Sequence, residues 1–213
     1  MKPPTQVQIG RFALPGELAT EAGGSGLVVF AHGSGSSRSS PRNRFVALHL
    51  QRHGLGTLLF DLLTEAEGTD RAKVFDIDLL AARLCEALDW IAAQAELAQM
   101  RIGLFGASTG AAAALQAASR RPKNVAAVVS RGGRPDLAMD VLPRVRAPTL
   151  LIVGGEDIEV LHLNRIALAA LQCRKQLEIV PGATHLFEEP GTLAIAADLA
   201  ANWFGELLGR AAP

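Results

Sequence analysis

Short apolar runs alternate with longer amphipathic stretches along the chain. Continuous runs rich in Val, Ile and Leu are typical of strands that are covered on both faces of a parallel sheet. The runs predicted as strands are residues 7–9, 12–14, 27–31, 57–60, 101–105, 125–129, 149–153 and 177–180. Helices are predicted over residues 43–52, 74–96, 109–119, 161–171 and 192–208. This alternation predicts an α/β fold, in which helices cover both faces of a mostly parallel sheet.

The N-terminal segment departs from this pattern. Residues 6–20 carry Pro15-Gly16 between two short stretches of mixed polar and apolar residues, which indicates an antiparallel hairpin at the sheet edge. Residues 130–148, between two predicted strands, are too few for a separate cap domain, so we expect an open site. A length of 213 residues suits one core, and a single domain over residues 1–213 is therefore expected.

Charge and composition limit the kinds of partner that the protein is expected to bind. Lys plus Arg and Asp plus Glu number 21 each, so no positive surplus favours nucleic acid or an anionic membrane. Residues 1–6 lack the apolar segment of a secretory signal, and no apolar run reaches the ~20 residues of a membrane-spanning helix. We therefore expect a cytoplasmic protein that acts on a small molecule, as a monomer or homodimer.

The two cysteines indicate no disulfide and no metal site. Cys85 and Cys173 are the only cysteines, and a lone disulfide is improbable in a cytosolic domain. Neither residue lies near a second type of metal ligand at usable spacing. We expect free thiols, no bound metal and no cofactor.

The strongest chemical signal is a Gly-x-Ser-x-Gly motif at residues 106–110, between a predicted strand and a predicted helix. A serine on so sharp a strand-to-helix turn needs small neighbours, and Gly106 and Gly110 supply them. The helix that begins at Thr109 also points its positive end at the serine. Ser108 is therefore predicted as a nucleophile.

A serine nucleophile requires a base, and that base requires an acid to orient it. His185 follows the last predicted strand, and Asp157 follows the strand before it, so both should reach the carboxyl edge of the sheet with Ser108. Glu156 and Glu159 stay open as competing acids. The other histidines, apart from His32, fall on or next to predicted helices, where solvated or packing roles are expected: His49, His53 and His162.

The segment that follows the strand over residues 27–31 is rich in glycine. The backbone amide of Ser34 in this loop, together with that of Thr109, is predicted to hold the oxyanion, while His32 braces the loop. The competing interpretation of Gly33-Ser34-Gly35 as a dinucleotide fingerprint is weak, because Arg38 stands where the third glycine should fall.

Taken together, these four motifs resemble the α/β-hydrolase superfamily, and within it the small, cap-free dienelactone-hydrolase-like branch. The motifs are residues 32–35, 106–110, 154–157 and 182–185, in that order along the chain. The resemblance implies a sheet of about eight strands with an antiparallel N-terminal edge, and cofactor-free hydrolysis of an ester-like bond. Dienelactone hydrolases proper use cysteine where this chain has Ser108, so dienelactone is not assumed as substrate.

The predicted function is hydrolysis of a carboxylester, lactone or thioester through an acyl-enzyme. The alternatives are a peptidase or amidase, and a binding module of the same fold that lacks chemistry. Four arginines are candidates for binding an anionic substrate group, with solvated loop charge as the alternative: Arg38, Arg42, Arg131 and Arg134. Asp61 is expected either to order the polar loop through Asp70 or to reach the site.

Overall fold

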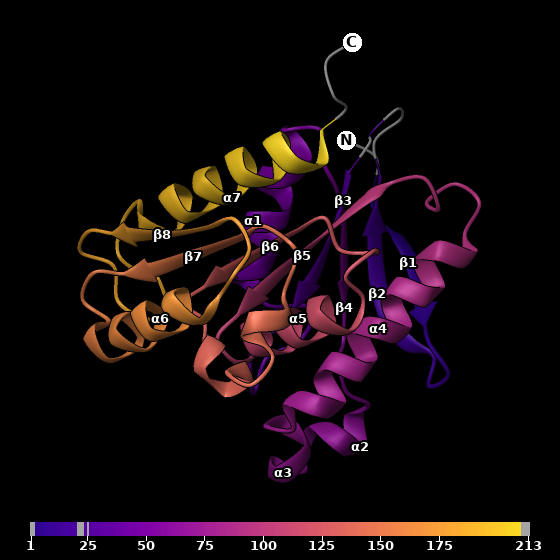
Figure 1. Ribbon diagram of the computed structural model, residues 1–213. Helices are drawn as coiled ribbons and strands as arrows, with labels where there is room; N and C mark the ends of the chain where they lie inside the picture. Colours follow the sequence, from indigo (N-terminus) through magenta and orange to yellow (C-terminus); the bar gives the residue numbers. More distant parts are fainter. Residues whose placement is uncertain (1–2, 21–23, 25, 210–213) are drawn as a thin grey trace.

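The computed structural model describes residues 3–20, 24 and 26–209, and it contains one mixed sheet (Figure 1). In the described residues the sheet has eight strands in the order β1-β2-β4-β3-β5-β6-β7-β8. The strands are β1 (Thr5–Ile9), β2 (Leu14–Ala19), β3 (Gly26–Ala31), β4 (Gly56–Phe60), β5 (Arg101–Ala107), β6 (Ala127–Arg131), β7 (Thr149–Gly154) and β8 (Lys175–Val180). Strands β3 to β8 pair in parallel, and β1 and β2 form the antiparallel edge, so the predicted fold class is confirmed.

The N-terminal hairpin exists, but its turn lies earlier than the sequence suggested. The turn is at residues 10–13, where Gly10 and Ala13 have positive φ angles of 65° and 50° and the Ala13 amide donates to the Gly10 carbonyl. The predicted strand over residues 12–14 is therefore wrong, and Pro15-Gly16 lies inside β2. Proline is tolerated there because it stands near the start of the strand, where a missing N–H costs least.

Helices cover both faces of the sheet. Helices α1 (Pro41–Arg52) and α7 (Thr192–Leu208) lie on one face, and α4 (Ile77–Ala93), α5 (Thr109–Arg120) and α6 (Ile158–Ala170) lie on the other (Figure 1). Two 3-10 turns, η1 (Pro135–Ala138) and η2 (Leu142–Arg144), fill the connection from β6 to β7. No helix in the described part of the chain has the length and apolar character needed to cross a bilayer.

The helix predicted over residues 74–96 is shorter than expected, because Asp76 caps α4 by accepting from the Leu79 amide. Two short helices precede it, α2 (Glu65–Gly68) and α3 (Arg71–Val74), and the sequence pattern did not predict them. A capping box between Thr64 and Glu67 starts α2. Both helices lie beside the N-terminal part of α4 (Figure 1).

The core has two layers, one on each side of the sheet. Alternate residues of β3 face opposite sides, so Leu27 and Val29 pack with α4 and α5, whereas Val28 and Phe30 pack with α1 and α7. This double cover explains why β3 to β7 read as nearly continuous apolar runs. It also keeps the carboxyl ends of the parallel strands rigidly spaced, and the candidate site is built on these ends.

Candidate active site

Ser108 stands on the turn between β5 and α5, in a backbone conformation that L-residues rarely adopt. Its φ and ψ angles are 52° and −124°, which are unfavourable for a residue with a Cβ. The flanking glycines make the turn possible. A Cβ on Gly106 would lie 2.6 Å from the Ala111 nitrogen, and one on Gly110 would lie 2.2 Å from the Ala31 oxygen. The turn thus holds the serine, half-buried, at the carboxyl edge of the sheet.

His185 and Asp157 lie together on neighbouring loops after β8 and β7. The Nδ1 atom of His185 is 2.7 Å from an Asp157 carboxylate oxygen. The two loops are joined by a hydrogen bond of 3.0 Å from the Glu156 amide to the Ala183 carbonyl. Gly154 is needed at this crossing, because a Cβ there would lie 2.3 Å from the same carbonyl oxygen. Of the three candidate acids, the structure pairs Asp157 with the histidine.

Ser108 and His185 line one small cavity of about 220 Å³. Because Nδ1 of His185 faces Asp157, Nε2 is the ring nitrogen left to exchange a proton with a group in this cavity. The loop after β3 forms the opposite wall with Gly33, Ser34 and Ser36. The residues predicted as nucleophile and base therefore line the same cavity at the carboxyl edge of the sheet, and the predicted acid is bound to the predicted base.

The loop after β3 is held in place by His32. Its Nδ1 lies 3.1 Å from the Gly33 carbonyl, and its Nε2 accepts a hydrogen bond of 3.0 Å from the Leu62 amide. This pair of contacts requires the neutral ring that carries its proton on Nδ1. Burial, as the largest effect, lowers the pKa of His32, which favours the same form. His32 is thus neutral and holds the loop through two hydrogen bonds, in line with the bracing role that the sequence suggested.

The two amides predicted to hold the oxyanion are next to each other. The Ser34 amide donates a hydrogen bond of 2.9 Å to the Thr109 side-chain oxygen. Thr109 is the first residue of α5, so its own amide has no helical carbonyl one turn earlier to bond. Before the Ser34 amide can bind an oxyanion, the Thr109 hydroxyl must turn away from it.

Three of the four candidate arginines already have carboxylate partners, and two of these three lie outside the cavity that contains Ser108. Arg38 forms an ion pair with Asp61, which also accepts a hydrogen bond of 2.7 Å from the Arg38 amide. Asp61 therefore fastens the loop after β3, instead of ordering the loop through Asp70 as the sequence suggested. Arg134 is bound by both oxygens of Asp136, at 2.9 and 2.8 Å. Neither arginine lines the cavity that contains Ser108.

The other two arginines do line that cavity. Arg42, in the first turn of α1, makes an ion pair of 3.1 Å with Glu188, a glutamate on the surface. Arg131, the last residue of β6, is only 6% exposed. Its Nε and Nη1 atoms are buried without a hydrogen-bond partner among the described residues.

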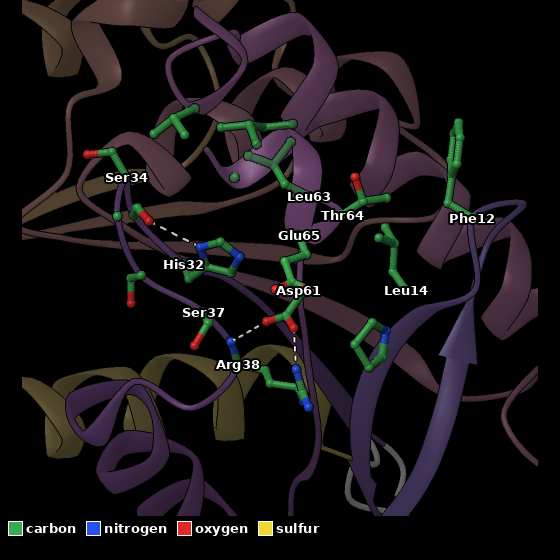
Figure 2. A pocket seen from close by; sticks show the side chains of 17 residues that line it. Phe12, Leu14, His32, Ser34, Ser37, Arg38, Asp61, Leu63, Thr64 and Glu65 are labelled. Carbon is green, nitrogen blue, oxygen red and sulfur yellow. Dashed lines mark hydrogen bonds and ion pairs between the residues drawn. The ribbon is translucent and has the colours of Figure 1, made fainter. Parts of the chain in front are cut away.

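A larger cavity of about 660 Å³ adjoins the first one and shares Gly33, Ser34 and Ser36 with it. Figure 2 shows this cavity, with the Arg38–Asp61 ion pair on one side and apolar side chains on the other. The apolar wall consists of Phe12, Leu14, Leu63, Val74 and Leu80. Val74 of this wall belongs to α3, and Glu65 and Gly68 of α2 also line the cavity, so two helices that the sequence pattern did not predict contribute to it. The Thr-x-x-Glu pattern of the capping box at residue 64 is the signal that predicts a helix start there.

Comparison with known proteins agrees with this fold. Residues 65–207 match the dienelactone hydrolase family. The crystal structure of a dienelactone hydrolase from Anabaena variabilis is 54% identical, covers 96% of this chain and 97% of that one, and has a TM-score of 0.93. The structure of Est1E from Butyrivibrio proteoclasticus, 13% identical, covers 98% of this chain and all of that one, and shares the fold with a TM-score of 0.81.

A relative from Mycobacterium tuberculosis carries a different provisional name, phosphoribosyl transferase. It is 58% identical over 199 residues, which make up 93% of this chain but 45% of that protein. The chain therefore spans less than half the length of this curated relative. The family match covers most of the chain, and the structural match extends over nearly all of it. The chain belongs to the dienelactone hydrolase family.

Proposed function

We propose that this protein is a serine hydrolase that cleaves an ester-like bond of a small substrate through an acyl-enzyme. One observation carries the proposal: a serine on a strained turn shares a cavity with a histidine whose other ring nitrogen is bound to a carboxylate. A serine hydroxyl is a weak nucleophile until a base takes its proton. An inert binding module has no physical need for all three groups.

The reaction begins when His185 takes the proton of Ser108 as the serine oxygen attacks the carbonyl carbon. The tetrahedral intermediate collapses, His185 gives its proton to the leaving alcohol or thiol, and an acyl-serine is left. Water, deprotonated by the same histidine, then attacks the acyl-serine; the bond to the Ser108 oxygen breaks, His185 returns the proton to that oxygen, and the acid is released. Asp157 keeps the ring oriented and stabilises its charged form between these steps.

Stabilisation of the oxyanion is assigned to the amides of Thr109 and Ser34. The N-terminus of α5 lies directly behind Ser108, so its partial positive charge favours the negative oxygen. The Ser34 amide becomes available when the Thr109 hydroxyl rotates. We expect this rotation to accompany substrate binding, since an oxyanion is a stronger acceptor than a hydroxyl.

The transferase name of the mycobacterial relative does not change this proposal. That name applies to a protein more than twice as long as the matched region. The groups around Ser108 support acyl transfer to water, and we carry no transferase activity over to this chain.

Labelling with a fluorophosphonate tests the proposal, because such probes react with activated serines. We expect rapid labelling of the wild-type protein and hydrolysis of short p-nitrophenyl or thioester substrates, both lost in Ser108→Ala. Ser119→Ala is the matched control, since Ser119 lies at the far end of α5 and bonds only to the Gln116 carbonyl in the described residues. A wild-type protein that is neither labelled nor active on these substrates would refute the proposal.

A further inference from the structure

The guanidinium of Arg131 is the most unusual charged group in the described part of the molecule. It is buried at the end of β6, lines the cavity beside Ser108, and has no carboxylate partner among the described residues. Its positive charge has a cation–π contact with the ring of Phe187, whose centre lies 5.6 Å from the guanidinium carbon. An aromatic face attracts a cation only weakly and leaves the N–H donors unbonded.

Such a group is unfavourable in a folded protein. Burial first, and then repulsion from Arg42, lowers the pKa of Arg131 to about 10. The side chain nevertheless keeps its charge at neutral pH. A buried charge without a counter-charge costs free energy that an anionic ligand in the adjoining cavity would recover.

The small cavity around Arg131 is positive as a whole. Among the described residues its lining includes Arg42, Arg131 and His185, but no aspartate or glutamate. Asp157 is bound to the far nitrogen of His185, and the partner of Arg42, Glu188, has a side chain 64% exposed to solvent. Hydroxyl donors complete the lining at Ser34, Ser36 and Ser40.

The backbone adds positive charge at the same place. Ser40, Arg42 and Asn43 belong to the cap and first turn of the 12-residue helix α1, and all three line the cavity. The partial positive charge of a helix N-terminus favours an anion. In the first turn of α1, Pro41 has no N–H and the Asn43 amide is bonded to the Ser40 side chain, so the amide left for a ligand is that of Arg42. In the sheet, Arg131 pairs with Ala107, so its Cα lies one strand spacing, about 4.8 Å, from the residue before the nucleophile.

We propose that this end of the cavity binds a phosphate group of the substrate, held by Arg131 and Arg42. The inference rests on the proposed hydrolase function and specifies its substrate class. A phosphate monoester carries nearly two negative charges at neutral pH. It can therefore balance Arg131 and also compete with the exposed Glu188 for Arg42, whereas a carboxylate balances only one guanidinium. Three serine hydroxyls and a helix end also suit the several acceptor oxygens of phosphate better than the two of a carboxylate.

The size of the cavity limits where the phosphate sits on the substrate. About 220 Å³ must hold both the phosphate and the scissile carbonyl, so the two groups are separated by only a few bonds. The remainder of the substrate extends past Gly33 and Ser34 into the larger cavity of about 660 Å³. The substrate class is therefore an ester or thioester with a phosphate close to the reacting carbonyl.

Binding of inorganic phosphate to the Ser108→Ala protein tests the site without any turnover. Titration calorimetry or ³¹P NMR should show one phosphate bound per chain. Arg131→Met should weaken this binding by at least about 30-fold, as expected for the loss of a buried charge partner. Arg121→Met is the control and should bind like its parent, since Arg121 lies half-exposed at the other end of α5 and pairs with Asp89.

Kinetics on matched substrates provide a second test of the phosphate site. Thioesters of one acyl skeleton that end in a methyl, a carboxylate or a phosphate should be compared by kcat/KM. We expect the phosphorylated substrate to be preferred, and the ratio of phosphorylated to neutral substrate to fall at least about 30-fold in Arg131→Met. Equal or greater preference for the carboxylate, or phosphate binding that survives Arg131→Met, overturns the proposal.

Failure of this inference can be told apart from failure of the proposed function. Labelling at Ser108 and hydrolysis of neutral esters without any phosphate binding would reject the phosphate site and leave the hydrolase. Phosphate bound through Arg131 in a protein that neither labels nor hydrolyses would reject the hydrolase and leave the site.

Discussion

Replacing Arg131 by methionine should make the free protein more stable. Methionine has a similar length and an apolar side chain, so it can occupy the same space beside Phe187 without a charge. The wild-type side chain is 6% exposed and two of its nitrogens have no partner among the described residues. Removing an unpaired buried charge should therefore raise the free energy of unfolding, in contrast to most core substitutions.

The magnitude follows from the pKa of Arg131. The fall of this pKa from its ordinary higher value to about 10 corresponds to about 3 kcal/mol of destabilisation of the charged form. Imperfect packing of methionine offsets part of this, so we expect a net gain of about 2 kcal/mol. For a chain of this length that gain raises Tm by roughly 4–8 °C.

The pH dependence has a defined sign. The pKa in the folded state lies below that in the unfolded state, so the unfolded chain holds the proton more tightly. The penalty is complete at every pH below about 10 and is relieved only as pH rises above that value. Measurements at pH 7 therefore report the full difference between the two proteins.

Thermal and urea unfolding of both proteins, in buffer without phosphate, measure the effect. Adding phosphate should then stabilise the wild type and leave Arg131→Met almost unchanged, since a ligand stabilises only the state that binds it. An Arg131→Met protein that is less stable than wild type in phosphate-free buffer would refute this reasoning, because it would mean that the guanidinium is satisfied in the native protein.

Three further outcomes are expected. Asp157→Asn should lower kcat on ester substrates by about 10³–10⁴-fold while leaving the circular dichroism spectrum unchanged, because the ring loses its orienting charge; an unchanged kcat would contradict the assigned role. Gly106→Ala should abolish activity or folding, because its Cβ would lie 2.4 Å from the Ala111 Cα. Gly205→Ala has open space around it inside α7, and it should raise the free energy of unfolding in urea by about 0.5–1 kcal/mol. The pKa of His32 is lowered in the folded protein, so the unfolded chain binds the proton more readily as pH falls below about 6.5, and the free energy of unfolding drops. His32→Gln should reduce that drop between pH 7.5 and 5. If the variant and the wild type show the same dependence of unfolding free energy on pH, His32 is not held neutral.

The sequence predicted most of the sheet because its central strands carry a strong local signal. Covered on both faces, they read as continuous apolar runs, and their carboxyl ends are marked by glycine-rich loops. The order of those loops was enough to bring Ser108, His185 and Asp157 to one edge, because parallel strands end on the same side. The steric need for Gly106 and Gly110 follows from the turn itself.

The sequence was less informative wherever the outcome depended on contacts between distant residues. The hairpin turn lies at residues 10–13, and not at Pro15-Gly16 where the sequence suggested it. Pro15 is instead accommodated near the start of β2, which the local sequence pattern does not reveal. The four candidate arginines were equivalent in sequence. Only the folded chain shows that Arg38 is neutralised by Asp61, 23 positions away, and that Arg131 is not neutralised by any described carboxylate.

The contrast with a second buried arginine gives the last prediction. The side chain of Arg83, 2% exposed, forms ion pairs with Glu67 at 3.0 Å and Glu86 at 3.4 Å, and its guanidinium lies 4.0 Å from the centre of the Phe12 ring. Arg83 is therefore a buried structural arginine whose charge is neutralised by carboxylates of the protein itself. Arg131 is buried to a similar degree with an aromatic neighbour, but it lacks the carboxylates.

The same substitution should therefore have opposite effects at the two positions. Arg83→Met leaves Glu67 without its cation and Glu86 with only the exposed Arg11. It should lower the free energy of unfolding by about 3 kcal/mol, whereas Arg131→Met should raise it. Urea unfolding of both variants under one condition makes the comparison internal, since the residue type, the replacement and the solvent are the same. If both variants lose stability, the charge at Arg131 is balanced within the protein; if only Arg83→Met does, the counter-charge for Arg131 must come from a ligand.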